Sequence, residues 1–109
     1  MKILLAAREQ EKSKIIFVLQ KTEVLVEIVD TLSDFEKITD NFELALVDED
    51  FGSLQTGWQL ALKIRNKRPS ARIVMIVRSN PKQEYLPLYD VTLSLPISED
   101  ELIGEVNRG

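Results

Sequence analysis

Short, almost continuously apolar runs alternate along the chain with segments whose apolar residues recur at helical spacing. Such runs are typical of strands buried on both faces of a sheet, and the spaced pattern is typical of helices that cover such a sheet. The predicted strands are 2–7, 24–29, 42–47, 72–77 and 91–95, and the predicted helices are 9–21, 34–39, 57–67 and 99–107. This alternation predicts a doubly wound α/β fold with a five-stranded parallel sheet and helices on both of its faces.

Residues with clear conformational preferences mark the ends of several helices. Thr31 or Ser33 could cap the short second helix, because a hydroxyl oxygen accepts a hydrogen bond from a free N–H of the first turn. Ser98 is followed three residues later by Glu101, which is the pattern of a capping box at the start of the last helix. Pro69 ends the third helix, since proline cannot continue the hydrogen-bond ladder.

The segment 80–90 departs from the regular alternation. It contains Pro81 and Pro87, and each proline disfavours a helical conformation of the residue before it. We therefore predict that this segment lacks a full-length helix, so that the fourth helix of the fold is reduced.

Composition and charge argue against several classes of function. The chain has 109 residues, the size of one domain, and no apolar run long enough to span a bilayer. Its formal net charge of -4 disfavours a nucleic-acid surface, which needs a basic patch. It has no cysteine and no histidine, so it lacks a thiolate nucleophile and the commonest general base. We expect a cytoplasmic protein without cofactor, metal, enzymatic activity, or contact with nucleic acid or membrane.

Charged residues gather where the predicted strands end. Asp48, Glu49 and Asp50 follow the third strand, Arg8 follows the first, and Arg78 follows the fourth. In doubly wound sheets, ligands and chemistry collect beyond the carboxyl ends of the strands. The three acids have three interpretations: a solvated loop, a metal site, or a charge pair in which Asp48 meets Arg8 or Arg78.

The ordered set of segments resembles the receiver domain of bacterial response regulators over nearly the whole chain. The matching pieces are Lys2-Ile-Leu-Leu, Leu44-Ala-Leu-Val-Asp48, Gly57-Trp-Gln-Leu-Ala-Leu-Lys-Ile-Arg65, Pro69-Ser-Ala-Arg-Ile-Val-Met-Ile-Val77 and Leu95-Pro96-Ile-Ser98. The resemblance implies the flavodoxin-like strand order 2-1-3-4-5. The stretch from Arg78 to Leu95 is shorter than the family pattern by about one helical turn, which agrees with a reduced fourth helix.

The resemblance assigns the phosphoacceptor position of receivers to Asp48, but the positions that serve it have changed. Receivers hold magnesium with two acidic residues after the first strand; here Ala7 and Arg8 stand in those positions, with Glu9 as a displaced candidate. A methyl group and a guanidinium do not supply the oxygen ligands that magnesium requires. We therefore expect an arginine, first Arg8 and otherwise Arg78, to pair with Asp48 in place of the metal.

Two further receiver positions have lost their usual chemistry. The hydroxyl residue after the fourth strand is replaced by Arg78, with Ser79 one step later, and the lysine after the fifth strand is replaced by Leu95. Phosphoryl transfer depends on positioning and charge stabilisation, which these replacements remove. We therefore expect an atypical pseudo-receiver that acts without phosphorylation. The alternative is a conventional receiver that is phosphorylated on Asp48 with magnesium.

An apolar and aromatic cluster lies in the irregular segment. Tyr85, Leu88 and Tyr89, with Leu86 between them, either complete the core where the helix is reduced or form a surface for a partner. In receivers, the surface from the fourth helix to the last helix commonly makes dimer and partner contacts. We predict that this surface docks a protein partner or an output domain, with a homodimer as the alternative. Trp58 is expected to pack its helix against the sheet.

These observations describe one receiver-like domain over residues 1–109. The last helix is short for the family, which suggests either a part of a longer regulator or a short natural form. The predicted role is signalling by protein–protein interaction in a bacterial two-component or transcriptional regulator. No glycine-rich phosphate loop follows the first strand, which disfavours a third class of function, that of a small-ligand or flavin-binding α/β domain.

Overall fold

The five apolar runs form one parallel sheet. The computed structural model describes residues 1–53 and 55–108 of the chain. The strands are β1 (Lys2–Ala6), β2 (Leu25–Ile28), β3 (Leu44–Asp48), β4 (Arg72–Val77) and β5 (Val91–Ser94). Their order across the sheet is β2-β1-β3-β4-β5, and every neighbouring pair is parallel. The predicted fold class and strand order are confirmed.

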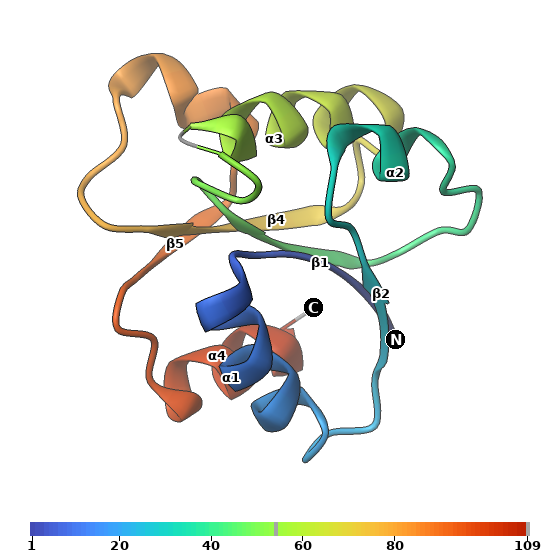
Figure 1. Ribbon diagram of the computed structural model, residues 1–109, viewed down its shortest axis with the longest axis vertical. Helices are drawn as coiled ribbons and strands as arrows, with labels where there is room; N and C mark the ends of the chain where they lie inside the picture. Colours follow the sequence, from blue (N-terminus) through green and yellow to red (C-terminus); the bar gives the residue numbers. More distant parts are fainter. Residues whose placement is uncertain (54, 109) are drawn as a thin grey trace.

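Helices cover both faces of this sheet (Figure 1). They are α1 (Glu9–Leu19), α2 (Leu32–Glu36), α3 (Thr56–Lys67), the 3-10 helix η1 (Gln83–Leu88) and α4 (Glu99–Arg108). Helices α1 and α4 lie on one face, and α2, α3 and η1 lie on the other. Within residues 1–53 and 55–108, no helix has the length and apolar character that crossing a membrane requires.

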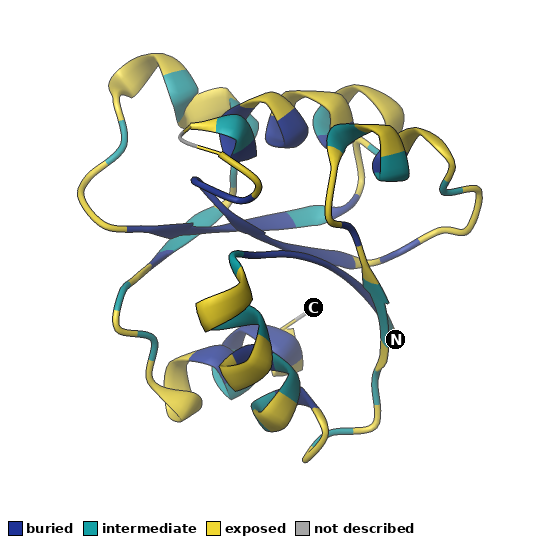
Figure 2. Cartoon of the chain, viewed as in Figure 1, coloured by how far each residue is buried: buried dark blue, intermediate teal, exposed yellow. Residues whose placement is uncertain are grey.

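Alternating side chains of the central strands build two cores, one on each face of the sheet. In β1, Leu4 and Ala6 belong to the core under α2 and α3, whereas Ile3 and Leu5 belong to the core under α1 and α4. All four are fully buried, and Figure 2 shows the same burial along β3 and β4. A buried leucine or isoleucine contributes about 1.5–3 kcal/mol. Apart from Lys2, Asp48 and Arg72 at their ends, the central strands are therefore apolar, while the edge strands β2 and β5 keep exposed positions.

Side-chain caps explain where two helices begin. Thr31, not Ser33, caps α2: its hydroxyl accepts a hydrogen bond from the N–H of Asp34, whose carboxylate accepts one from the N–H of Thr31. The cap places the start of α2 at Leu32, so the predicted helix 34–39 is corrected to Leu32–Glu36. Ser98 caps α4 as predicted, because its hydroxyl accepts a hydrogen bond from the N–H of Glu101.

The segment between β4 and β5 forms only η1, as its prolines predict. This 3-10 helix has six residues, with Pro87 inside it. The segment is tied to the sheet by Asp90, whose carboxylate accepts hydrogen bonds from the N–H of Ile73 and from the guanidinium of Arg65. Burial raises the pKa of Asp90, but those two donors outweigh burial and hold the pKa below its ordinary value. Charge-assisted hydrogen bonds thus anchor the reduced segment.

Candidate functional site

The carboxyl ends of three neighbouring strands bring the charged residues together. Arg8 follows β1, Asp48 ends β3, and Arg78 follows β4, and β3 pairs with both of the other strands. Asp48 is completely buried, and Glu49 and Asp50 are only 7% and 8% exposed. The interpretation of these acids as a solvated loop is therefore wrong. Buried carboxylates need cationic or N–H partners, and the geometry supplies both.

Arg8 provides the counter-charge to Asp48. Its Nε donates a hydrogen bond to Oδ2 of Asp48 at 2.7 Å, and its backbone N–H approaches the same oxygen at 3.4 Å. The other oxygen, Oδ1, accepts the N–H of Asp50 at 2.9 Å. The Arg8 side chain is 15% exposed, so water screens the pair only in part. With about 4 Å between charge centres and an effective dielectric of ~20, the attraction is on the order of 4 kcal/mol before desolvation is subtracted.

Arg78 pairs with a different carboxylate. Its Nη1 lies 3.0 Å from Oδ2 of Asp50, and its backbone N–H donates to Oε2 of Glu49 at 2.8 Å. The other oxygen of Asp50 accepts a backbone N–H from the loop before α3. Of the two arginines considered for Asp48, it is therefore Arg8 that contacts this carboxylate.

Glu49 has an unfavourable environment for its charge. Burial raises the pKa of Glu49 above the ordinary 4.5, and the charges of Asp50 and Asp48 raise it further. The indole N–H of Trp58 and the guanidinium of Arg8 act in the opposite direction without cancelling the increase. Ionisation of Glu49 therefore weakens the folded state as pH rises from 4.5 through the raised pKa, which is the opposite of what a salt-bridged carboxylate does.

The amino end of α3 packs directly against the acidic turn. The N–H of Gly57 donates to the carbonyl oxygen of Glu49 at 2.8 Å. A Cβ atom at position 57 would lie 2.2 Å from the carbonyl oxygen of Asp48 and 2.6 Å from Cα of Glu49, so only glycine fits. The sequence indicates Gly57 only as the start of a helix. The one available signal of its role at the site is the general tendency of glycine to mark a close backbone approach.

The donor set does not fit the magnesium ion that receivers hold. Both oxygens of Asp48 accept hydrogen bonds from N–H groups, and one of these groups belongs to the guanidinium of Arg8. Magnesium needs oxygen ligands in a near-octahedral arrangement, and a fixed cation beside Asp48 repels a second one. In the described part of the chain, no group of three or more acidic, cysteine or histidine side chains is placed to hold a metal ion.

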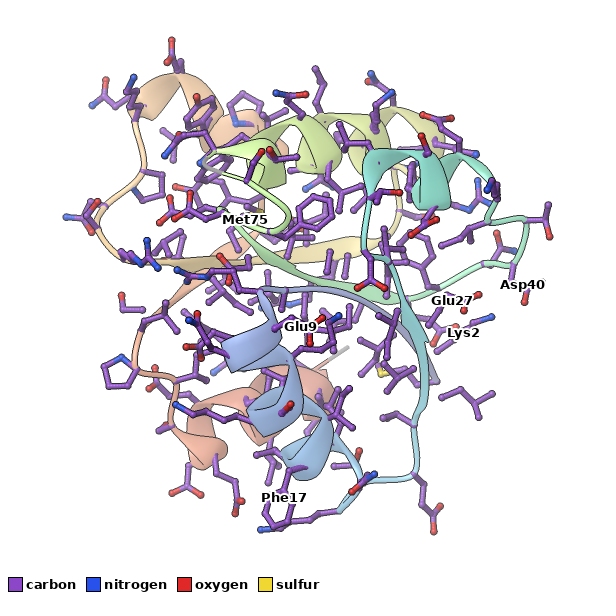
Figure 3. The ribbon with its side chains drawn as sticks, in the orientation of Figure 1. Lys2, Glu9, Phe17, Glu27, Asp40 and Met75 are labelled. Carbon is purple, nitrogen blue, oxygen red and sulfur yellow. The ribbon has the colours of Figure 1, made fainter. Side chains whose placement is uncertain are left out.

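The residues that the resemblance assigns to the other phosphoryl-binding positions of receivers carry different chemistry. Ala7 offers a buried methyl group, and Leu95 packs on the core under α1 and α4. Glu9, labelled in Figure 3, lies on the surface at the start of α1, and its carboxylate is 2.8 Å from Nζ of Lys12. Ser79 is exposed. The surroundings of Asp48 thus differ from those that the resemblance to receivers implies.

The aromatic cluster joins η1 to α3. The ring of Tyr85 stacks on Trp58 with centroids 4.3 Å apart and planes at 9°, and the ring of Tyr89 meets Trp58 edge-on at 5.8 Å. Trp58 is buried, and Leu88 packs on the same core. Tyr85, Leu88 and Tyr89 therefore take part in packing and remain partly exposed. Leu86, between them, points outwards and is 56% exposed.

Comparison with solved structures shows that the chain has the fold of receiver domains. A CheY-like receiver domain protein from Methanospirillum hungatei JF-1 matches with a TM-score of 0.82 and 21% identity, over 98% of this chain and 90% of that chain. A two-component response regulator from Clostridium difficile matches with a TM-score of 0.81 and 20% identity, over 99% of this chain and 93% of that chain. No family model matches the sequence, and no curated protein matches it by sequence.

Two response regulators from Thermotoga maritima extend this comparison. TrrA, solved in complex with magnesium and beryllofluoride, matches with a TM-score of 0.79 and 20% identity, over 98% of this chain and 96% of that chain. DrrB, an OmpR/PhoB homologue, matches with a TM-score of 0.79 and 19% identity. The match covers 98% of this chain and 51% of DrrB, so the present chain spans about half the length of that regulator. At these identities the similarity establishes the fold.

Proposed function

We propose that this chain is an atypical receiver domain that signals through protein–protein contacts, without being phosphorylated and without enzymatic activity of its own. The observation that carries the proposal is the pair between Arg8 and the buried Asp48. In this proposal, the guanidinium lies against the carboxylate that the resemblance assigns as phosphoacceptor and leaves no room beside it for a metal ion. We assign the domain to the cytoplasm, within a bacterial two-component or transcriptional regulator.

A fixed cation at this position changes how the domain can signal. Phosphoryl transfer depends almost entirely on positioning and on electrostatic stabilisation. Arg8 neutralises Asp48 permanently, and the N–H donors of Arg8 and Asp50 occupy its two oxygens. Leu95 brings no cationic group that could pair with a phosphate. The domain therefore stays in one state or is switched by the partner that it binds.

One of the similar structures supports a role outside conventional phosphotransfer. It belongs to a family of redox sensors in the streptococci that is described as having evolved from two-component response regulators. The match has a TM-score of 0.75 and 18% identity, and covers 98% of this chain and 49% of that chain. The present chain has no cysteine, so thiol chemistry is not open to it.

The proposal is tested by exposing the protein to a phosphodonor. With magnesium and acetyl phosphate, intact-mass measurement should show no phosphoryl adduct, and magnesium with beryllofluoride should leave the unfolding temperature unchanged. TrrA, whose structure contains magnesium and beryllofluoride, is the positive control. A phosphoryl adduct that is lost in Asp48→Asn would refute the proposal and establish the competing function, a conventional receiver that uses Asp48 with magnesium.

We propose further that the protein partner or output domain docks around η1 and the β5 edge of the sheet. Tyr85, Leu88 and Tyr89 are partly exposed there, and Leu86 is exposed. Aromatic and apolar groups that are exposed together are typical of interfaces. Helices η1 and α4 lie on opposite faces of the sheet, so they share a surface only around β5, the edge strand (Figure 1). A homodimer is the alternative occupant of this surface.

Replacing Leu86 with glutamate should abolish docking of the output domain or, for the alternative occupant, self-association in sedimentation velocity. It should not lower the free energy of unfolding, because this side chain points outwards. Tyr89→Glu should also abolish association, but it removes an edge contact with Trp58 as well and is the less specific variant. Leu62→Glu is the matched control, since Leu62 is 48% exposed on α3. If the Leu86→Glu variant associates as strongly as the wild type, the surface around η1 is not the interface.

A further inference from the structure

Arginines gather at the edge of the sheet opposite to Asp48. The chain has six arginines, and three of them, Arg68, Arg72 and Arg108, line a cleft of about 550 Å³ at the amino ends of β3 and β4. Phe42 and Ala71, both buried, line its apolar part. The chain as a whole has a net charge of -4, so its composition does not account for this concentration of guanidinium groups. We refer to this feature as the arginine cleft.

Within the described residues, Arg68 forms no ion pair with a carboxylate. Its Nη2 donates to the carbonyl oxygens of Thr39 and Asp40 at 3.3 and 3.4 Å, and its Nη1 donates to that of Lys67 at 3.1 Å. The carboxylate of Asp40 is turned to Lys2, 2.7 Å from its Nζ (Figure 3). In the described part of the chain, the guanidinium is held by dipoles, those of carbonyl groups and of the carboxyl end of α3. A partly buried cation held in this way favours the approach of an anion.

Arg72 and Arg108 share one carboxylate. Nη2 of Arg72 lies 2.7 Å from Oε1 of Glu105, and Nη1 of Arg108 lies 3.6 Å from Oε2. Another carboxylate on the rim, that of Glu43, accepts the backbone N–H of Lys2 at 2.7 Å. The cleft thus brings together the guanidinium groups of Arg68, Arg72 and Arg108 and the carboxylates of Glu105 and Glu43. These five groups have a net charge of about +1.

We propose that the arginine cleft binds a small molecule that carries a phosphate or pyrophosphate group. Guanidinium groups present planar forks of N–H donors that match phosphate oxygens. The cleft is larger than a phosphate group. Its apolar part, formed by Phe42 and Ala71, can contact the portion of the ligand that carries the phosphate. The cleft is separated from the Asp48 site by the length of β3, about 16 Å for five residues. The proposal therefore does not depend on the state of Asp48.

Inorganic pyrophosphate, without magnesium, is the probe. Calorimetric titration of the wild type should show saturable binding at millimolar concentration or below. Arg108→Gln should weaken this binding by about tenfold, equivalent to about 1.4 kcal/mol. The Arg108 side chain is 68% exposed, so its replacement leaves the fold intact. Lys14→Gln removes one positive charge from an exposed position of α1, remote from the cleft, and should leave the affinity unchanged.

Arg68→Gln should weaken pyrophosphate binding at least as much as Arg108→Gln. Because it also releases the carbonyl oxygens of Thr39 and Asp40, its unfolding midpoint in urea is measured beside its affinity. If Arg68→Gln does not fold, Arg108→Gln still decides the question. Absence of saturable binding by the wild type, or an equal loss in Lys14→Gln, would overturn the proposal. The titration contains neither magnesium nor a phosphodonor, so its result does not bear on the proposed function.

Discussion

Gly57→Ala should destabilise the domain by about 3 kcal/mol or more, since overpacking against atoms that cannot move is costly. The added Cβ would lie 2.2 Å from the carbonyl oxygen of Asp48 and within 3 Å of two backbone atoms of Glu49. All of these contacts are backbone atoms of the acidic turn, so no side-chain rotation relieves them. Urea unfolding followed by the fluorescence of Trp58, the single tryptophan, measures the effect.

Gly104→Ala is the matched control for this substitution. Gly104 lies inside α4, and a Cβ atom there would have no neighbour within 4 Å. Alanine should therefore stabilise the domain by about 0.5–1 kcal/mol, because it is the better helix former. If Gly57→Ala unfolds at the same urea concentration as the wild type, the close approach of α3 to the acidic turn is not a structural requirement.

Arg8→Gln should lower the free energy of unfolding by about 3 kcal/mol, because it leaves the charge of Asp48 buried without a cation. Asp48 is completely buried, and the N–H groups of Arg8 and Asp50 are the remaining donors to its carboxylate. Asp48→Asn should cost less, because the Arg8 side chain is 15% exposed and can turn its charge to water.

A double-mutant cycle separates the pair from its surroundings. The double variant Arg8→Gln with Asp48→Asn should be less destabilised than the two single variants together. The exposed pair of Lys63 and Glu36 is the matched control, and removing Lys63 should have little measurable effect. If the effects of the two site substitutions simply add, Arg8 and Asp48 do not stabilise each other.

The strands could be predicted from the sequence because burial on both faces leaves a simple signal. Ile3 to Ala6 must be apolar whichever face each side chain meets, and an unbroken apolar run indicates this directly. The start of α2 was less predictable, because Thr31 and Ser33 are both good caps. The choice depends on which hydroxyl lies beside the N–H groups of the first turn, and tertiary structure decides that.

The members of the site could be predicted, but not all of their contacts. Arg8 and Arg78 follow strands that flank β3, so both were candidates for Asp48. The backbone N–H of Arg78 donates to Glu49, and its guanidinium reaches Asp50. Such a backbone hydrogen bond depends on the path of the loop after β4, which no local pattern of residues specifies.

The arginine cleft was not predicted at all. Arg68 follows α3, Arg72 begins β4 and Arg108 ends α4. These positions are up to 40 residues apart in the chain, and no single sequence motif contains all three. Their proximity arises only because parallel strands align their amino ends at one edge of the sheet and because α3 and α4 end at that edge.

Calorimetric titration with magnesium tests most directly the central claim that Arg8 stands where a receiver holds its metal ion. The wild type should give no binding heat at millimolar magnesium, because the guanidinium neutralises Asp48 and repels the cation. Arg8→Asp should acquire measurable affinity by adding an oxygen ligand, though not phosphotransfer, since Leu95 brings no cation to the phosphate. Magnesium binding by the wild type with a millimolar or tighter constant would contradict this account.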